Sequence, residues 1–254
     1  MITRILTIET SEDICSVAVF ENQQCMIDMS DNTGKNHSQI LTVLINKALE
    51  KANLDISLID AVAISRGPGS YTGLRIGTSV AKGLCYALRK PLLAVNTLEV
   101  LCYAALDHPD FMRHRSGQPW LCPMIDARRM EVYMQIFDDQ IKPVSAIEAK
   151  IVGSETFTDM LRTQKMIFFG SGSEKIAFLY HSPNAVFIKN IRPLARYMIE
   201  PALAAYHSGI FEDVAYFEPY YLKDFVATRS TNKILRGSYV QFENLPFRKR
   251  DRKL

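Results

Sequence analysis

Residues 65–83 read SRGPGSYTGLRIGTSVAKG. They follow an apolar segment, so the sequence predicts a buried strand at Ile59–Ile64, a glycine loop and a long helix at about Thr72–Leu88. Glycines between a strand and a helix let backbone N–H groups approach an anion at the positive helix end. The spacing is nevertheless one residue longer than the dinucleotide fingerprint, and the Gly-Lys-Ser/Thr ending of a phosphate loop is missing. We therefore interpret Gly67 and Gly69 chiefly as parts of a tight turn, and secondarily as an anion site.

Small residues continue into the predicted helix. Gly73, Gly77, Ala81 and Cys85 recur every four residues, so they share one helix face. A row of small side chains forms a groove that allows a neighbour to approach closely. That neighbour is either internal, such as the sheet or the helix expected at Ser38–Lys51, or a helix of another chain. The spacing alone leaves both possibilities open.

The segments around this stretch predict an α/β subdomain at residues 1–106. The other expected elements are strands at Arg4–Glu9, Cys15–Phe20, Gln24–Met29 and Pro91–Val95, and helices at Ser38–Lys51 and Thr97–Leu106. Residues 107–119 are polar and interrupted by proline, so they predict a linker or a long loop.

The pattern then begins again. Leu121–Asp126 is an apolar strand that ends in an acid, as Arg4–Glu9 does, and Glu131–Phe137 repeats Cys15–Phe20. Both repeats are offset by 117 residues without a gap. A constant offset of this kind indicates a duplicated domain.

The second subdomain is expected to span residues 120–223. Its further expected elements are helices at Glu155–Arg162, Glu174–Tyr180 and Leu194–His207, and strands at Met166–Phe169 and Ala185–Lys189. Pro201 predicts a kink or break in the last helix. A basic extension at 224–254 follows. For its charged end we favour a solvated terminus over an RNA- or partner-binding tail.

Composition describes an ordinary globular protein. The chain has 254 residues, 48% of them apolar, and a formal net charge of +3, which is too small to indicate a nucleic-acid groove. Five cysteines, mostly in apolar segments and without a Cys-x-x-Cys pair, suggest buried thiols in a reducing compartment. The N-terminus resembles no signal peptide, and no segment is apolar enough for a membrane helix, so we expect a cytoplasmic protein.

Several motifs together resemble the TsaB (YeaZ) family. The resemblance runs in order from Ile5 to about Lys223, and the glycine stretch is its most specific part together with IDAR-x-x-EVY. The matching segments are ILTIETS, CSVAVF, HSQILTVLINKAL, SRGPGSYTGLRIGTSVAKGL, VNTLEVL, MIDARRMEVYMQIF and EPYYLK.

The resemblance implies an α/β fold of two actin/Hsp70-like (ASKHA, RNase H-like) subdomains related by duplication. It also implies a non-catalytic scaffold or activating subunit in the synthesis of N6-threonylcarbamoyladenosine at position 37 of ANN-decoding tRNAs. The implied partners are a TsaD-like homologue, which transfers the threonylcarbamoyl group, and a TsaE-like ATPase. Contact with tRNA would be indirect, and the isolated chain could form a homodimer. No catalytic residue, metal or cofactor is expected.

In this family the partner binds the two N-terminal helices. The residues expected at that interface are His37, Leu41, Leu44, Ile45, Leu49, Tyr71, Gly73, Leu74, Gly77, Val80, Ala81 and Leu84. TsaD-type chains carry a His-x-x-x-His metal pair on the first of these helices, whereas only His37 stands near it in this sequence. That departure fits an assisting subunit.

Actin-like ATPases hold metal and phosphate with an acid and hydroxyls at a hairpin. The residues that could form a vestigial nucleotide or anion loop are Glu9, Thr10, Ser11, Gly67, Gly69 and Asp126. Many family members have Asp where this chain has Glu9, and Ala127 lacks a hydroxyl, so a full ATP site is not expected. Two alternatives remain open: a stand-alone actin-like ATPase or kinase that uses these residues, and a peptidase acting on TsaD, for which the sequence offers neither a triad nor a metal pair.

Overall fold

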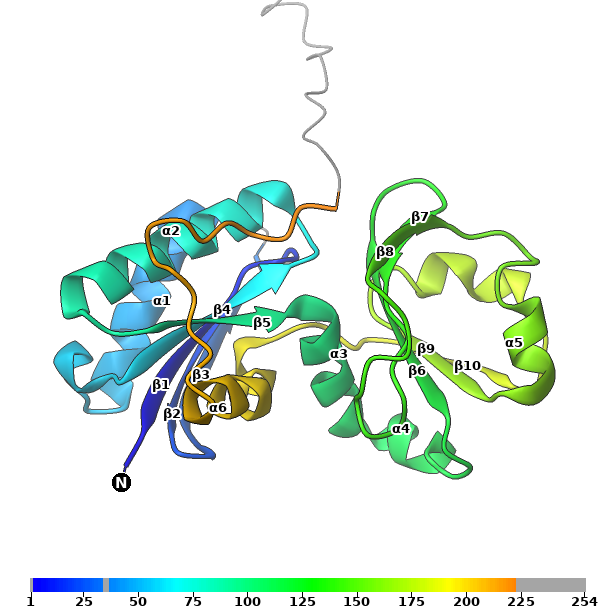
Figure 1. The fold of residues 1–254 in the computed structure, drawn as a ribbon, viewed down its shortest axis with the longest axis horizontal. Helices are drawn as coiled ribbons and strands as arrows, with labels where there is room; N and C mark the ends of the chain where they lie inside the picture. Colours follow the sequence, from blue (N-terminus) through cyan, green and yellow to red (C-terminus); the bar gives the residue numbers. More distant parts are fainter. Residues whose placement is uncertain (1, 34–36, 223–254) are drawn as a thin grey trace, which may run out of the picture. The chain divides into compact units, whose positions relative to one another are not determined.

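A computed structural model describes residues 2–33 and 37–222, which form two five-stranded sheets flanked by helices (Figure 1). The first half contains β1 (Arg4–Glu9), β2 (Cys15–Glu21), β3 (Gln24–Asp31), α1 (His37–Lys51), β4 (Ala61–Gly67), α2 (Tyr71–Leu88), β5 (Leu92–Asn96) and α3 (Thr97–Leu106). The second contains α4 (Pro109–His114), β6 (Trp120–Asp126), β7 (Glu131–Met134), β8 (Glu148–Ile151), α5 (Thr158–Thr163), β9 (Met166–Phe169), β10 (Ala185–Ile188) and α6 (Ile199–His207). Short 3-10 helices lie at Ile56–Leu58, Glu174–Leu179 and Ala195–Tyr197. The expected basic extension lies outside the described residues.

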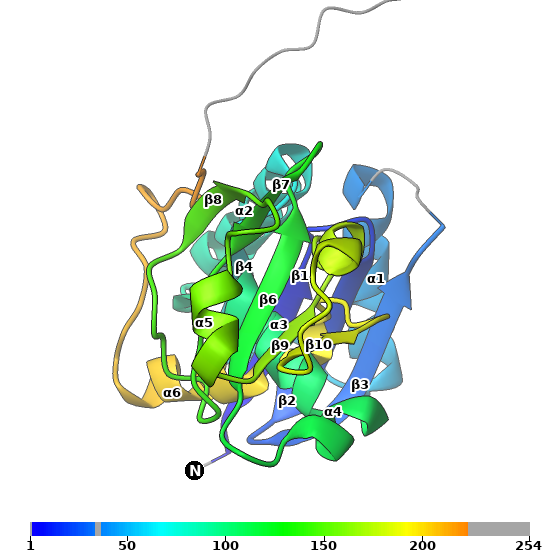
Figure 2. The same ribbon diagram turned by 90° about the vertical axis from the view of Figure 1, so that its right-hand side faces the viewer.

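The two sheets have the same topology. Their strand orders are β3-β2-β1-β4-β5 and, in the equivalent direction, β8-β7-β6-β9-β10. In each sheet the first strand is antiparallel to the second and parallel to the fourth. Figure 2 turns the second sheet toward the viewer, with α5 beside it. The predicted α/β fold with two subdomains related by duplication is therefore confirmed. We call the halves built on β1–β5 and on β6–β10 the first and second subdomains.

The ungapped register predicted for the duplication is wrong by one residue. Glu9 pairs with Ser16, seven positions further along, whereas Asp126 pairs with Val132, six positions further along. A shift of one residue exchanges the two faces of a strand. The two acids also differ in their burial: Glu9 is buried, and Asp126 is exposed.

Helices α1 and α2 cover one face of the first sheet. Leu41 of α1 and Ala81 of α2 belong to one buried cluster with Leu6 and Ile8 of β1. Each fully buried aliphatic side chain of this kind contributes about 1.5–3 kcal/mol to folding. The prediction of both helices from their apolar spacing is accurate to within one residue at each end.

The other face of the first sheet is covered by a segment that we expected in the second subdomain. Ala195, Met198 and Ala202 pack against Ile5 and Phe20, so the chain returns to the first sheet before and within α6. Apolar spacing predicts that such a helix has a buried face, but it does not indicate which sheet buries it. The predicted linker at 107–119 likewise contains a helix, α4.

Three further differences are local. Pro201 lies in the first turn of α6, where its missing N–H leaves no helical hydrogen bond unmade, so it does not break the helix. Cys25 is exposed, whereas the other four cysteines are buried as expected. Within residues 2–33 and 37–222, no helix combines the length and apolar character that crossing a membrane requires.

Candidate functional site

The loop that follows β1 is the centre of the predicted site. Glu9 is fully buried, and its Oε1 accepts hydrogen bonds from the Ser11 N–H at 2.6 Å and from the Ser65 hydroxyl at 3.0 Å. Its Oε2 has no hydrogen-bond partner among the described residues. Burial raises the pKa of Glu9, and the hydrogen bonds to Ser11 and Ser65 oppose that rise only in part. Glu9 therefore binds this loop to β4 rather than facing an open site.

The glycine loop packs against protein atoms. A Cβ on Gly69 would lie 2.5 Å from the carbonyl oxygen of Ser11, and one on Gly67 would lie 2.9 Å from that of Tyr220. The Ser70 N–H donates to the Ser11 carbonyl at 2.6 Å, and the Ser70 side chain accepts from the N–H of Gly73. Two of the amides that an anion would need are thus already bonded. The geometry favours the tight turn over the anion site.

The small-residue face of α2 also packs inside the chain. A Cβ on Gly73 would lie 2.1 Å from the Thr10 carbonyl oxygen, and one on Gly77 would lie 2.2 Å from the Thr10 hydroxyl and 2.9 Å from Ile64. The neighbour of this face is therefore internal: the loop after β1 and strand β4. This resolves the alternative that the sequence left open, and it explains why glycine is required there.

Many of the residues expected at the partner interface are buried in the first subdomain. These are Leu41, Leu44, Ile45, Leu49, Gly73, Leu74, Gly77 and Ala81. They cannot be reached by a partner while the subdomain is folded, because helix spacing places them toward the sheet. The other expected residues, His37, Tyr71, Val80 and Leu84, are half-buried.

The outer face of α1 and α2 contains residues that the sequence reasoning missed. Val43 is 46% exposed on α1, and Thr72 and Arg75 are exposed on α2. Tyr71 contacts the Tyr221 ring at a centroid distance of 4.7 Å, and Arg75 lies 5.1 Å over the Tyr71 ring. The sequence did contain a signal for this face: Val43 is an apolar residue at a helix position that faces away from the buried residues of α1.

The site residues predicted after the two equivalent strands do not come together. Glu9, Thr10, Ser11, Gly67 and Gly69 gather around the start of α2, as described above. Asp126 instead pairs with Lys175 at 2.5 Å in the second subdomain. Among residues 2–33 and 37–222, no three His, Cys, Asp or Glu side chains are placed to hold a metal ion.

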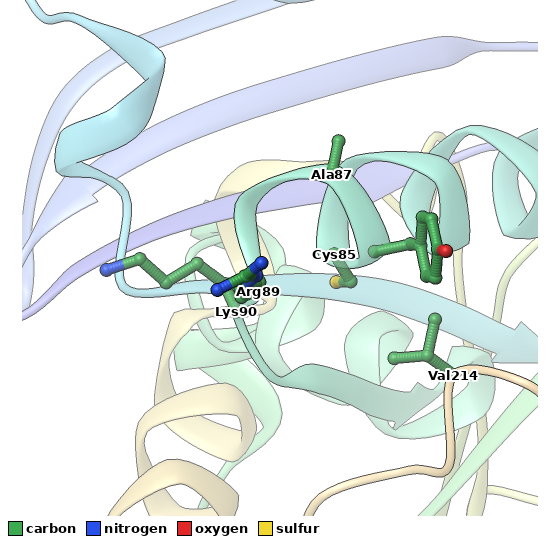
Figure 3. Close-up of a pocket in the computed structure, with 6 residues that line it drawn as sticks. Cys85, Ala87, Arg89, Lys90 and Val214 are labelled. Atoms are coloured by element: carbon green, nitrogen blue, oxygen red, sulfur yellow. The ribbon is translucent and has the colours of Figure 1, made fainter.

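A pocket lies at the other end of α2, away from the glycine loop. It has a volume of about 540 Å³ and is lined by Cys85, Tyr86, Ala87, Arg89, Lys90 and Val214 (Figure 3). Lys82 holds the segment beside it by donating to the carbonyl oxygens of Ala215 at 3.1 Å and Phe217 at 3.0 Å. Lys90 approaches Asp60 at 3.5 Å. The lining contains no pairing of a nucleophile with a base.

Two sheets of identical topology, with helices and a close-packed glycine loop at the carboxyl ends of β1 and β4, define a two-subdomain α/β protein of the actin-like class. The sequence profile of the family described as TsaD, tRNA N6-adenosine threonylcarbamoyltransferase, matches residues 30–216. The chain belongs to this family, within its TsaB (YeaZ) branch.

Individual relatives agree with this assignment. The chain is 25% identical to the tRNA threonylcarbamoyladenosine biosynthesis protein TsaB of Haemophilus influenzae over 229 residues, covering 87% of this chain and 93% of that protein. It is 32% identical to TsaB of Escherichia coli over 130 residues, covering 51% and 53% of the two chains. The solved structure of YeaZ from Pseudomonas aeruginosa superposes with a TM-score of 0.71 at 25% identity, covering 87% of this chain and all of that one.

Proposed function

We propose that this protein acts in the biosynthesis of N6-threonylcarbamoyladenosine in tRNA, as a non-catalytic subunit that supports a TsaD-like transferase. The observation that carries the proposal is the similarity to TsaB over 87% of the chain, together with the TsaD family profile over residues 30–216. We further propose that the protein works in the cytoplasm, with a TsaE-like ATPase as a further partner and tRNA contacted indirectly. The isolated chain would be able to form a homodimer.

The proposed partner surface is the outer face of α1 and α2, defined by Val43, Thr72, Arg75 and Val80. Two features support it. Helix α2 is seated closely on the first subdomain, because Gly73 and Gly77 touch the loop after β1. The outer face also exposes an apolar side chain, Val43 of α1, and Val80 of α2 is half-buried. Two helices that are held closely on the sheet offer ridges and grooves that suit packing against the helices of a homologous chain.

The cellular experiment is depletion of the protein followed by mass spectrometry of tRNA nucleosides. We expect the threonylcarbamoyladenosine content to fall and to recover when the protein is supplied again. A content that stays constant after complete depletion would contradict the proposed function.

The partner surface is tested by a matched pair of substitutions. Val43→Asp places a charge on the proposed surface, and Val144→Asp places one in the second subdomain at a residue of equal exposure, 46%. We expect Val43→Asp to weaken binding to the TsaD-like partner by about tenfold or more, equivalent to about 1.4 kcal/mol, and Val144→Asp to leave it unchanged. Isothermal titration with both purified chains measures the affinities. Equal affinities for the two variants would contradict the surface.

A further inference from the structure

The pocket at the carboxyl end of α2 has an apolar wall and a basic end. Tyr86 and Val214 contribute apolar surface to its lining, and Tyr86 is 83% exposed. Arg89 and Lys90 contribute positive charge. In Figure 3 the Cys85 side chain lies between Arg89 and Val214. The volume of about 540 Å³ is within the range of sites that bind small molecules.

The wall that contains Val214 is held in place from both sides. Before it in the chain, the N–H of Glu212 donates to the carbonyl oxygen of Leu92, in β5, at 2.9 Å. After it, the two hydrogen bonds from Lys82 described above fix the chain to α2. The apolar wall is therefore formed in the protein without a ligand, as is usual for small-molecule sites.

The two cations of the basic end differ in their partners. The Lys90 ammonium lies 3.5 Å from Asp60, and in Figure 3 its side chain extends away from Val214. Arg89 is exposed and forms no ion pair within residues 2–33 and 37–222. A guanidinium group can bind a carboxylate through two parallel hydrogen bonds. Arg89 thus offers one unit of positive charge in a geometry that suits a carboxylate.

The backbone of Arg89 has a conformation that glycine adopts more easily. Arg89 directly follows α2, and its φ of 54° and ψ of 44° are left-handed. Its N–H donates to the carbonyl oxygen of Tyr86 at 3.4 Å, and the N–H of Lys90 donates to that of Cys85 at 3.0 Å. Helices that end in this way usually have glycine at the left-handed position, because a side chain there is sterically unfavourable. The arginine is present in spite of that cost. The two hydrogen bonds also occupy carbonyl oxygens that would otherwise repel an anion beside it.

We propose that this pocket binds a small aromatic carboxylate, with the carboxylate paired to Arg89 and the ring against Tyr86 and Val214. One unpaired guanidinium group matches one negative charge, and the exposed Tyr86 offers a ring for stacking. A nucleoside triphosphate carries several negative charges, which a single unpaired cation does not match. The site lies at the opposite end of α2 from the glycine loop, and it does not depend on the proposed function.

The ligand class is tested on the full-length chain with 2-naphthoate, whose binding is followed by saturation-transfer NMR. Two further probes separate the two parts of the ligand: 2-naphthamide has the ring without the charge, and acetate has the charge without the ring. We expect 2-naphthoate to bind saturably, and each of the other probes to bind at least about tenfold more weakly. The absence of saturable 2-naphthoate binding up to about 10 mM would overturn the site, as would equal binding of 2-naphthamide or of acetate.

A matched pair of arginine substitutions tests the basic end. Arg89→Gly removes the guanidinium group and keeps the left-handed backbone, which glycine favours. Arg129→Gly is the control, because Arg129 is also exposed with a positive φ, 51°, and lies between β6 and β7. We expect Arg89→Gly to weaken 2-naphthoate binding by at least about tenfold and Arg129→Gly to leave it unchanged. Equal affinities would show that Arg89 serves only the end of the helix, and would overturn the site.

The apolar wall is tested by Tyr86→Ala, a change at an exposed position that leaves the core untouched. Loss of the stacking partner should weaken 2-naphthoate binding by about two- to tenfold, and acetate binding should not change. Parental affinity of Tyr86→Ala for 2-naphthoate would contradict the placement of the ring.

Discussion

A Cβ atom on Gly77 would lie 2.2 Å from the hydroxyl oxygen of Thr10. No ordinary non-bonded contact is that short, so α2 approaches the loop after β1 as closely as a hydrogen atom on Gly77 permits. Gly73 repeats this relationship one turn earlier, against the carbonyl oxygen of Thr10. The two glycines thus fix the distance between α2 and the loop that carries Glu9 and Glu12.

The first prediction concerns stability. Gly77→Ala should gain about 1 kcal/mol in helix propensity but lose more to overpacking against Thr10 and Ile64, for a net destabilisation of about 1–2 kcal/mol. Gly83→Ala is the matched control in the same helix, because nothing lies within 4 Å of its Cβ position. It should be stabilised by about 0.5–1 kcal/mol. Urea unfolding measures both, and a Gly77→Ala protein as stable as Gly83→Ala would contradict the close contact.

Much of the fold could be predicted from the sequence because the signals were local. The apolar spacing of α1 and α2 and the small-residue face of α2 each arise within one element. The surface against which a helix or strand packs depends on residues that are distant in the sequence. The helix near Ile199 was predicted, but its packing on Ile5 and Phe20 depends on a chain reversal that periodicity does not encode.

The site was predicted less completely for a related reason. The residues around Glu9 were recognised, yet Asp126 was grouped with Glu9 because an ungapped offset was assumed. The pairing of the two hairpins differs by one residue, and Asp126 is exposed. The hydrogen bond that the Ser171 hydroxyl donates to Glu12 joins residues 159 positions apart. Neither residue belongs to a motif, so no sequence signal could have connected them.

A second prediction follows from the buried Glu9. Because burial raises its pKa in the folded protein, unfolding releases its proton once the pH exceeds the unfolded value of about 4.5. The cost of ionising Glu9 is therefore absent at low pH and grows as the pH rises. Glu9→Gln should lose less stability than the parent protein between pH 5 and pH 8. Guanidinium unfolding at both pH values gives the comparison.

Glu155→Gln provides the control for that experiment, since it removes an exposed carboxyl of the same type. Its change in stability between pH 5 and pH 8 should match that of the parent protein. If the stability of Glu9→Gln changes between pH 5 and pH 8 as much as that of the parent protein, the proposed cost of ionising the buried Glu9 is contradicted.

A third prediction concerns thiol reactivity. Cys25 is exposed, although partial burial and the charge of Asp28 raise its pKa as well. Burial raises the pKa of Cys85 to about 11 and that of Cys15 to about 12, and Cys102 and Cys122 are fully buried, so these four thiols are also out of reach of a reagent. Thiolates are the reactive form, so an excess of a thiol reagent at pH 8 should modify one cysteine in the folded protein and five after denaturation. Mass spectrometry of the intact chain counts the labels. A Cys25→Ser variant that still takes up one label in the native state would refute the assignment.

The last prediction separates the proposed subunit from a stand-alone nucleotide enzyme. An ATP phosphate at the start of α2 would need the space and the amides of the glycine loop. The Ser11 carbonyl oxygen accepts the Ser70 N–H at 2.6 Å and lies against Gly69, and the Tyr220 carbonyl oxygen lies against Gly67. Phosphate oxygens would be brought against these two carbonyl oxygens, which repel negative charge. The isolated chain is titrated with Mg-ATP up to about 1 mM. This titration detects only faintly any binding whose free energy is weaker than about −5 kcal/mol. We therefore expect no saturable heat. Micromolar binding, with release of phosphate by the isolated chain, would instead support the ATPase or kinase alternative, and it would require the loop at Ser11 to move away from Gly69.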